Sequence, residues 1–262
     1  MGQGKTAAYQ DVLDGLLACG PVKTWSLIVT VLGDLAAEPG TRVAGPVLSL
    51  LTEPMGLKPE ALRVAIHRLR RDGWVTSERD GRTSLYELTA HGRALTREAA
   101  ARVYGTEVEA PGRWHVVVAQ SAEAMQALDL PDMLQIGPRS ALLPGEAEGL
   151  SDAVLAWEAR AGAVPDWVKA ALVPEDLAAA YAVLARALAA ALALEPPAGP
   201  VERAVLRLLA LHQWRRLVLR HGPAVEALMG PDWDGARCRA GAGALLQRLG
   251  RPDPAELAAM LP

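Results

Sequence analysis

Cysteine is scarce in this chain of 262 residues, because only Cys19 and Cys238 occur. Two cysteines cannot build a disulfide framework, and they do not supply the ligand cluster of a structural metal site. So few cysteines suit a reducing compartment, and we expect a cytoplasmic protein. Phenylalanine is absent, whereas tryptophan occurs seven times, and nothing physical in the sequence explains this bias.

Motifs of several enzyme classes are also missing. The chain has no Gly-rich phosphate loop, no nucleophile elbow and no His-Glu-x-x-His zinc motif. Its five histidines, at 67, 91, 115, 212 and 221, are dispersed, which leaves a composite site open. The sequence therefore predicts a protein that is not an enzyme and that has no cofactor or metal.

Neither a leader nor a membrane span is indicated. The first residues, MGQGKTAAYQDVLDGLL, lack an apolar core followed by a cleavage site. The most hydrophobic run, residues 177–194, is rich in alanine and interrupted by Arg186. These features favour a packed helix over a membrane span, so we expect no membrane partner.

Positive charge is concentrated in one segment. The formal net charge is −3, yet residues 58–102 hold ten Lys or Arg and only six Asp or Glu. A chain that is acidic overall does not coat nucleic acid nonspecifically, but one basic segment on such a chain is the electrostatic footprint of a DNA-binding module.

The basic segment begins with an amphipathic helix. Pro59 suits its first position and Gly73 its end. Four apolar residues recur at the spacing of one buried stripe: Leu62, Ala65, Ile66 and Leu69. Basic residues occupy the other side: Arg63, His67, Arg70 and Arg71. The pattern predicts a helix with a cationic outer face.

A β-hairpin follows this helix. Residues 74–79 and 83–88 are β-prone runs, with Arg79 and Arg82 flanking the turn between them. Asp80-Gly81 predicts a type I′ turn, which needs positive φ at both central residues. Thr89 is the expected cap of a helix over residues 91–102.

The elements before the basic helix complete a known order. A buried helix is expected over residues 24–37, a second helix over 43–51 and a turn over 53–56. Helix, helix, basic helix and hairpin together predict a winged helix-turn-helix over residues 21–102, after a tail or leading helix at 1–20. The alternative is a solvated helix face beside an ordinary charged hairpin, but the ordered combination favours the DNA-binding interpretation.

The rest of the chain predicts two further domains. Over residues 103–165 we expect a buried strand at 114–119, a helix capped by Ser121, and strands at 133–136 and 141–143, the order of a small ferredoxin-like module. Residues 166–262 should form a helical C-terminal domain, with helices near 174–194, 201–221, 223–229 and 236–249. The predicted fold class is thus α+β and mostly helical.

Motifs at both ends resemble the PaaX-type phenylacetate-degradation repressors. The stretches that carry the resemblance are Thr24-Trp25-Ser26-Leu27, Gly33-Asp34, Leu62-Arg63-Val64-Ala65, Arg68-Leu69-Arg70-Arg71-Asp72-Gly73-Trp74, Gly81-Arg82, Tyr86-Glu87-Leu88-Thr89, Gly92, the run 212–220 and Gly230-Pro231-Asp232-Trp233-Asp234-Gly235. The chain departs from the family pattern at Gln213-Trp214, where an acidic residue and a tyrosine are usual, and at Asp234, where proline is common.

The resemblance implies a bacterial cytoplasmic transcription regulator with the three domains described above. It also implies a homodimeric repressor of aromatic-acid catabolism, relieved by an acyl-CoA effector, that binds a double-stranded DNA operator with an inverted repeat. In such a protein Arg63, His67 and Arg70 would face base edges in the major groove. Three more arginines would contact phosphates: Arg71, Arg79 and Arg82.

Effector contacts are expected on the C-terminal helix 201–221. His212, Arg215 and Arg216 form a basic group that could meet the phosphates of a coenzyme A ester. The alternative is a core-facing histidine beside arginines that pair with local carboxylates. Four tryptophans could line an acyl pocket or simply pack in the core: Trp157, Trp167, Trp214 and Trp233.

Two other functions remain open on the sequence alone. One is a DNA-binding scaffold that responds to no effector. The other is a ferredoxin-like nuclease, which would carry an aspartate at the end of its first strand. Here the predicted strand 114–119 runs into Gln120-Ser121, and the lack of a carboxylate there argues against metal-dependent cleavage.

Overall fold

The computed structural model describes residues 2–130, 132–160 and 163–261. The fold is α+β and 56% helical, with two small antiparallel sheets in these residues. The chain divides into two compact units. The first contains residues 1–105, 183–219 and 238–262, and the second contains 106–182 and 220–237. The C-terminal stretch 166–262 therefore contributes helices to both units.

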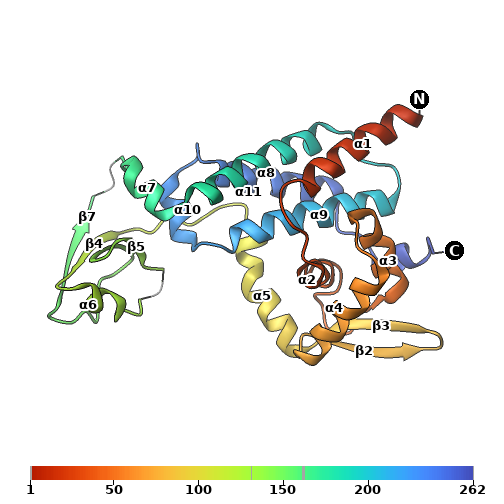
Figure 1. Ribbon diagram of the computed structural model, residues 1–262, viewed down its shortest axis with the longest axis horizontal. Helices are drawn as coiled ribbons and strands as arrows, with labels where there is room; N and C mark the ends of the chain where they lie inside the picture. The colour runs from red at the N-terminus through yellow and green to blue at the C-terminus, as the bar shows by residue number, and fades with distance from the viewer. Residues whose placement is uncertain (1, 131, 161–162, 262) are drawn as a thin grey trace. The chain divides into compact units, whose positions relative to one another are not determined.

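The N-terminal part of the first unit alternates helices with a small sheet (Figure 1). Its elements are α1 (Gly2–Leu17), α2 (Thr24–Leu35), β1 (Val43–Ala44), α3 (Gly45–Thr52), the 3₁₀ turn η1 (Glu53–Met55), α4 (Pro59–Arg71), β2 (Val75–Asp80), β3 (Thr83–Leu88) and α5 (Ala90–Tyr104). The predicted helices at 24–37, 59–73 and 91–102 are confirmed within two residues at most ends.

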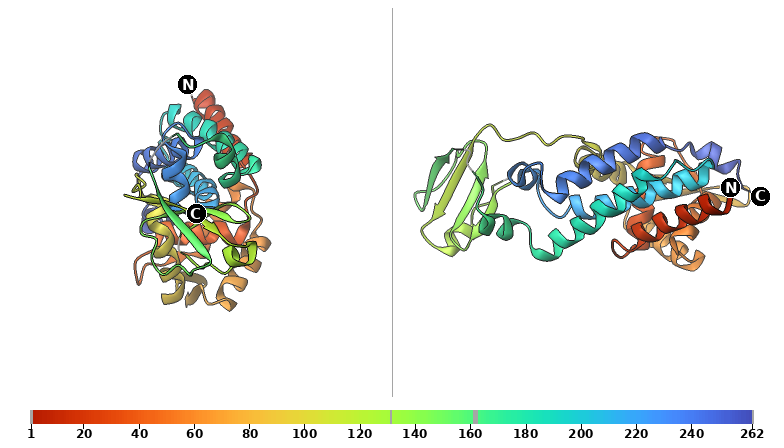
Figure 2. Two further views of the ribbon diagram at one scale, coloured as in Figure 1. Left: turned by 90° about the vertical axis from the view of Figure 1, so that its left-hand side faces the viewer. Right: turned by 90° about the horizontal axis from the view of Figure 1, so that it is seen from above.

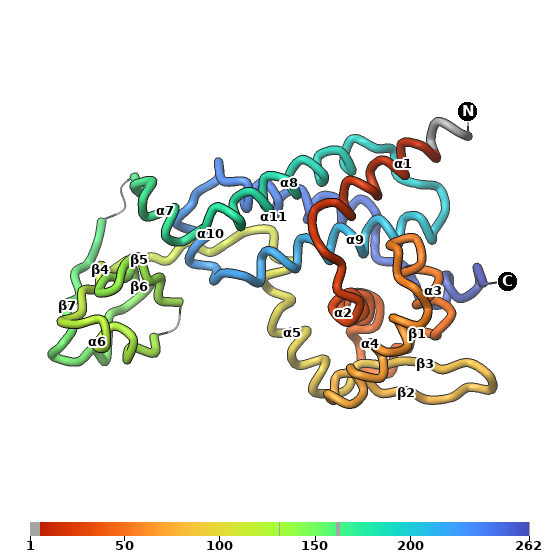
Figure 3. Tube along the Cα trace, viewed as in Figure 1, coloured from red at the N-terminus to blue at the C-terminus, as the bar shows by residue number. Residues whose placement is uncertain are grey.

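A three-stranded antiparallel sheet has the order β1-β3-β2. The expectation that a helix begins at Val43 was wrong by two residues, because Val43 and Ala44 pair with Tyr86 and Leu85 of β3. Figure 3 shows this short strand beside β3. The pairing ties the start of α3 to the hairpin, so both share one framework.

Two helices form the centre of the first unit. Helix α2 is buried from Leu27 to Leu35, and α9 (Pro200–Val218) is buried over most of its circumference. These two helices contact each other, and α1 lies along α9 (Figure 2). A helix that is apolar nearly all round belongs in a core rather than at a surface. The unit is completed by parts of α8 (Glu175–Ala193) and α11 (Asp234–Leu249) and by α12 (Pro254–Ala258).

Helix α8 is long and apolar enough to cross a membrane by length and composition. One such helix is weak evidence, since core helices meet the same test. Its buried residues form a single stripe with spacings of four and three: Leu177, Tyr181, Leu184, Leu188 and Ala191. That heptad-like spacing is typical of a helix packed against other helices.

The second unit is built on a four-stranded antiparallel sheet. Its strands are β4 (Trp114–Ala119), β5 (Leu134–Gly137), β6 (Ser140–Pro144) and β7 (Val154–Ala159), in the order β5-β6-β4-β7. Helix α6 (Ala122–Gln126) joins β4 to β5 and is capped by Ser121, as predicted. Helices α7 (Asp166–Leu172) and α10 (Pro223–Met229) also belong to this unit. Neither β7 nor α7 was predicted.

Only one face of β4 is buried, although the sequence predicted a buried strand. Val117 packs into a core with Met125 and Leu143, whereas Val116 and Val118 on the other face are 37% and 38% exposed. Successive side chains of a strand point to opposite faces of the sheet. An unbroken apolar run therefore does not prove that both faces are covered.

Candidate nucleic-acid interface

Helix α4 separates an apolar face from a basic one. Leu62, Ala65, Ile66 and Leu69 are buried, which confirms the predicted stripe. Gly73, with φ of 74°, ends the helix in a left-handed conformation that suits glycine. The amide of Trp74 then donates to the carbonyl of Leu69 at 2.9 Å, which returns the chain toward the helix.

The basic face of α4 is open to solvent. Arg63, His67, Arg70 and Arg71 are all exposed. Arg63 forms an ion pair with Glu60 at 2.9 Å, and Arg71 forms one with Asp72 at 3.2 Å. Exposed pairs of this kind are weak, worth about 0–1 kcal/mol. Both guanidinium groups can therefore exchange their carboxylate partner for another anion at little cost.

The hairpin carries two further exposed arginines, Arg79 and Arg82. Asp80 pairs with Thr83, so the two-residue loop is Gly81-Arg82. The predicted type I′ turn at Asp80-Gly81 was wrong. Gly81 has φ of 57°, and Asp132 is the one non-glycine residue with positive φ in the described part of the chain. Positive φ at the first loop position alone is the pattern of a type II′ turn, where glycine is preferred.

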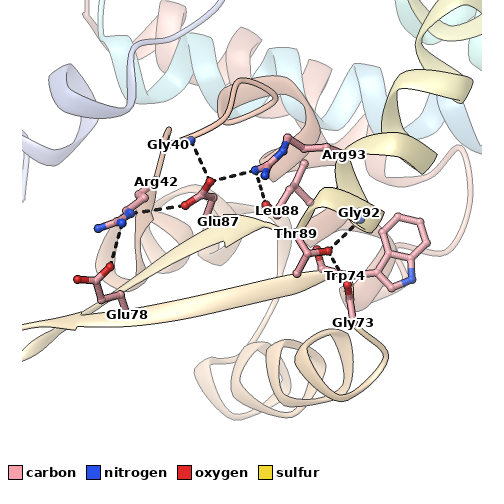
Figure 4. A network of polar contacts seen from close by, with 10 residues as sticks. All are labelled: Gly40, Arg42, Gly73, Trp74, Glu78, Glu87, Leu88, Thr89, Gly92 and Arg93. Carbon is pink, nitrogen blue, oxygen red and sulfur yellow. Dashed lines mark hydrogen bonds and ion pairs between the residues drawn. The ribbon is translucent and has the colours of Figure 1, made fainter.

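Charged contacts anchor the base of this hairpin (Figure 4). The carboxylate of Glu87 accepts a hydrogen bond from the amide of Gly40 at 2.9 Å and pairs with Arg93 at 3.0 Å. Arg42 forms two ion pairs across the sheet. Its Nη2 lies 2.9 Å from Oε2 of Glu78 on β2, and its Nε lies 3.6 Å from Oε2 of Glu87 on β3. The Gly40 amide, aided by Arg93 and Arg42, holds the pKa of Glu87 below its usual value. The network ties β2 and β3 to α5 and to the loop after α2.

The predicted cap of α5 is confirmed and has a second role. The hydroxyl oxygen of Thr89 accepts from the amide of Gly92 at 3.0 Å and donates to the carbonyl of Gly73 at 2.6 Å (Figure 4). Gly73 lies two residues after the end of α4. One side chain therefore links the end of α4 to the start of α5, and so helps to orient the basic helix.

Sequence reasoning missed Arg68 and Trp25 as neighbours of this surface. The guanidinium of Arg68 lies 5.9 Å from the ring centre of Trp25, which is 38% exposed on α2. Arg68 also pairs with Asp72 at 3.4 Å. The i, i+4 spacing of Arg68 and Asp72 is visible in the sequence, but the approach of α2 to α4 is not.

The three predicted effector residues lie on one side of α9, facing inward. His212 is 2% exposed, and its Nδ1 lies 3.3 Å from the hydroxyl of Thr30 on α2. Burial, aided by Arg215 and Arg216, lowers the pKa of His212 to about 4. Arg215 lines a cavity of about 20 Å³, room for one water at most. Arg216 donates to the carbonyl of Cys19 at 2.8 Å.

The four tryptophans considered for an acyl pocket do not line one enclosed space. Trp214 and Trp233 are buried, whereas Trp157 and Trp167 are 71% and 62% exposed. The indole of Trp214 donates to the carbonyl of Val103 at 2.9 Å, a packing role within the first unit.

Comparison with known proteins matches the region around α4 and the hairpin. The family model described as PaaX-like protein matches residues 23–92. The chain carries a PaaX-like domain. This domain runs from the residue before α2 into the first turn of α5 and includes both α4 and the hairpin. The resemblance inferred from the sequence motifs is thereby confirmed.

Similarity extends beyond the PaaX-like domain. The chain is 28% identical over 246 residues to the transcriptional repressor PaaX of Escherichia coli strain K12, which covers 84% of this chain and 78% of that protein. The solved structure of the uncharacterized protein Rv0674 from Mycobacterium tuberculosis has 22% sequence identity and a TM-score of 0.53. It covers 89% of this chain and 97% of that one, which shows a shared fold.

Proposed function

We propose that the protein is a sequence-specific DNA-binding transcriptional repressor of the bacterial cytoplasm. One observation carries the proposal: α4 exposes Arg63, His67 and Arg70 on the side opposite its buried stripe. The repressor named among its relatives supports the same function. Arginine pairs bidentately with guanine in the major groove, so a helix with this face can read sequence.

We further propose that residues 21–102 act as a winged helix-turn-helix. In this arrangement α3 and α4 form the helix-turn-helix, and β2 and β3 form the wing. Base contacts would come from three residues of α4: Arg63, His67 and Arg70. Phosphate contacts, which set the position of the protein on the duplex, would come from Arg71, Arg79 and Arg82. Support comes from the order of the elements and from the network that joins the hairpin to α5.

The ferredoxin-like interpretation of the middle segment rests on strand order. Numbered along the chain, the strands of the second unit lie in the order 2-3-1-4, with α6 between the first and second strands. This order supports the split βαβ arrangement that we propose for the module. Residues 145–153, which join β6 to β7, contain no helix, so the module lacks the second helix that such folds usually have.

The proposed repressor would act as a homodimer on an inverted repeat, because two copies of α4 would meet two half-sites. By analogy with the family, it would repress genes of aromatic-acid or related acyl-CoA catabolism, and an acyl-CoA would relieve repression. Contact of that effector with His212, Arg215 and Arg216 would require α9 to part from α2 and from the segment after α1, because these side chains bond to Thr30, Ser26 and Cys19 there.

A gel shift on the DNA upstream of the gene, across a salt series and with candidate acyl-CoAs, tests this function. A discrete complex that an acyl-CoA releases is expected. A complex that no acyl-CoA affects would favour the scaffold. Cleaved DNA in the presence of Mg²⁺ would favour the nuclease, although among the described residues no group of three His, Cys, Asp or Glu could hold a metal ion.

A further inference from the structure

A cavity of about 250 Å³ opens beside the anchored end of the hairpin, within the first unit. Its walls come from the end of α2, from α5 and from the segment after α11. The residues that decide its chemistry are Arg93, Arg97, Arg251, Glu38, Tyr104 and Leu88. Nothing in the function proposed above uses this space.

Positive charge dominates the walls, with three arginines against the exposed Glu38. Arg97 makes no ion pair or hydrogen bond within the described ranges. Arg251 is 54% exposed and forms only a long ion pair with Asp34, with 3.8 Å between Nε and Oδ1. Two of the three guanidinium groups are therefore available to an incoming acceptor.

The neighbouring carboxylate does not cancel this charge. Asp34 is buried and already accepts two hydrogen bonds from Arg207, at 2.7 and 2.9 Å. The hydroxyl of Tyr104, which lines the cavity, also donates to Asp34 at 3.0 Å. Because Arg207 and Tyr104 occupy that acid, Arg251 is held only by its long ion pair to Asp34, and Arg97 presents to the cavity a guanidinium that is unpaired among the described residues.

We propose that this cavity binds a small oxyanion, either a carboxylate or a phosphate group. The planar fork of a guanidinium matches both groups bidentately, and several such forks around one space give strong charge-assisted hydrogen bonds. The volume lies just below the range of about 300–1,000 Å³ typical of ligand pockets, so it holds a small molecule or one anionic group of a larger one.

The cavity is coupled to the hairpin through Arg93. This residue lines the cavity and also holds Glu87 at 3.0 Å and the carbonyl of Leu88 (Figure 4). An anion in the cavity competes with Glu87 for Arg93, and so loosens the base of the hairpin that carries Arg79 on β2 and Arg82 in its loop. This step rests on the proposed DNA-binding function, whereas the binding of the anion does not.

Calorimetric titration of the full chain with inorganic phosphate and with butyrate tests the site. Saturable binding of one probe is expected, and the probe that binds identifies the anion class. Arg97→Gln should weaken that binding at least tenfold. The control Arg113→Gln, which removes an exposed arginine of the second unit, should change it less than twofold. No saturable binding of either probe, or equal binding by wild type and Arg97→Gln, overturns the proposal.

Operator binding then tests the coupling separately. The bound probe should lower the DNA affinity of the wild type about fivefold or more relative to chloride at equal ionic strength, because salt alone also weakens DNA binding. Arg97→Gln should lose this response. An anion that binds without changing DNA affinity overturns the coupling. A wild type that binds the probe but no DNA overturns the proposed function and leaves the anion site standing.

Discussion

Asp34 on α2 and Arg207 on α9 form a bidentate ion pair in the core of the first unit, with 2.7 Å between Nε and Oδ2 and 2.9 Å between Nη2 and Oδ1. Both side chains are buried, at 1% and 5% exposure. The hydroxyl of Tyr104 donates to the same carboxylate, and this raises the pKa of the tyrosine in addition to the effect of burial. Helices α2, α9 and α5 are therefore joined through one carboxylate, both of whose oxygens accept hydrogen bonds.

Asp34→Asn is expected to destabilise the protein by about 3–5 kcal/mol, because it leaves the guanidinium of Arg207 buried without a counter-charge. Urea unfolding followed by circular dichroism measures the change. The matched control is Asp166→Asn, a fully exposed acid of the second unit, which should alter stability by less than about 0.5 kcal/mol. A loss below about 1 kcal/mol for Asp34→Asn would show that this pair does not hold α2 and α9 together.

The sequence could not have predicted that pair, because its members lie 173 positions apart. Local patterns, in contrast, predicted α4 and the hairpin closely. The stripe from Leu62 to Leu69 and the cap at Thr89 depend only on neighbours within a few residues. The exposure of Arg63 and Arg70 followed from the same helical period.

Errors arose where the decisive partner was distant or where two local patterns competed. Val43 joined a strand because β3 lay beside it. The turn shifted by one residue because the register of Asp80 with Thr83 placed Gly81 first in the loop. Strand β7 was not predicted because its outward-facing residues Leu155 and Trp157 are apolar. The run therefore lacks the alternation of apolar and polar residues that marks a half-buried strand. The inward orientation of His212 was one of the two alternatives that the sequence left open, and the packing of α9 against α2 decides between them.

Two arginine variants should weaken DNA binding in different ways. Arg63→Ala should reduce the discrimination between the operator and its single-base variants by about 1–3 kcal/mol, since a base contact is lost. Arg82→Ala should weaken all sequences alike and lower the salt slope by about one unit, since a phosphate contact is lost. Fluorescence anisotropy at several salt concentrations distinguishes the two. Equal losses across sequences for both variants would contradict this division of roles.

The buried imidazole of His212 should make stability depend on pH. Its pKa is about 4 in the folded protein and near 6.5 when unfolded. Between these values the unfolded chain binds a proton that the folded chain does not, so the free energy of unfolding falls as pH falls. At pH 5 the loss from this residue is about 2 kcal/mol relative to pH 7.

Urea unfolding at pH 7, 6 and 5 measures that dependence. His212→Gln lacks the titrating group, so its stability should fall by about 2 kcal/mol less over this range than that of the wild type. His91→Gln, which removes an exposed histidine and leaves His212 in place, is the control variant. Identical pH slopes for wild type and His212→Gln would mean that the buried imidazole does not set this dependence.

Gly92, in the first turn of α5, packs directly on the backbone that follows α4. A Cβ at this position would lie 2.3 Å from the carbonyl oxygen of Trp74 and 3.1 Å from its carbon. Gly92→Ala should therefore destabilise the protein by about 1–3 kcal/mol through overpacking, despite the better helix propensity of alanine. It should also weaken DNA binding, because α5 would shift away from the end of α4.

The control for Gly92→Ala is Gly15→Ala in α1, where nothing lies within 4 Å of the added atom. That variant should be stabilised by about 0.5–1 kcal/mol and bind DNA like the wild type. Thermal unfolding and anisotropy on the two variants separate helix propensity from steric conflict, and a stabilised Gly92→Ala would rule out the close contact between α5 and Trp74.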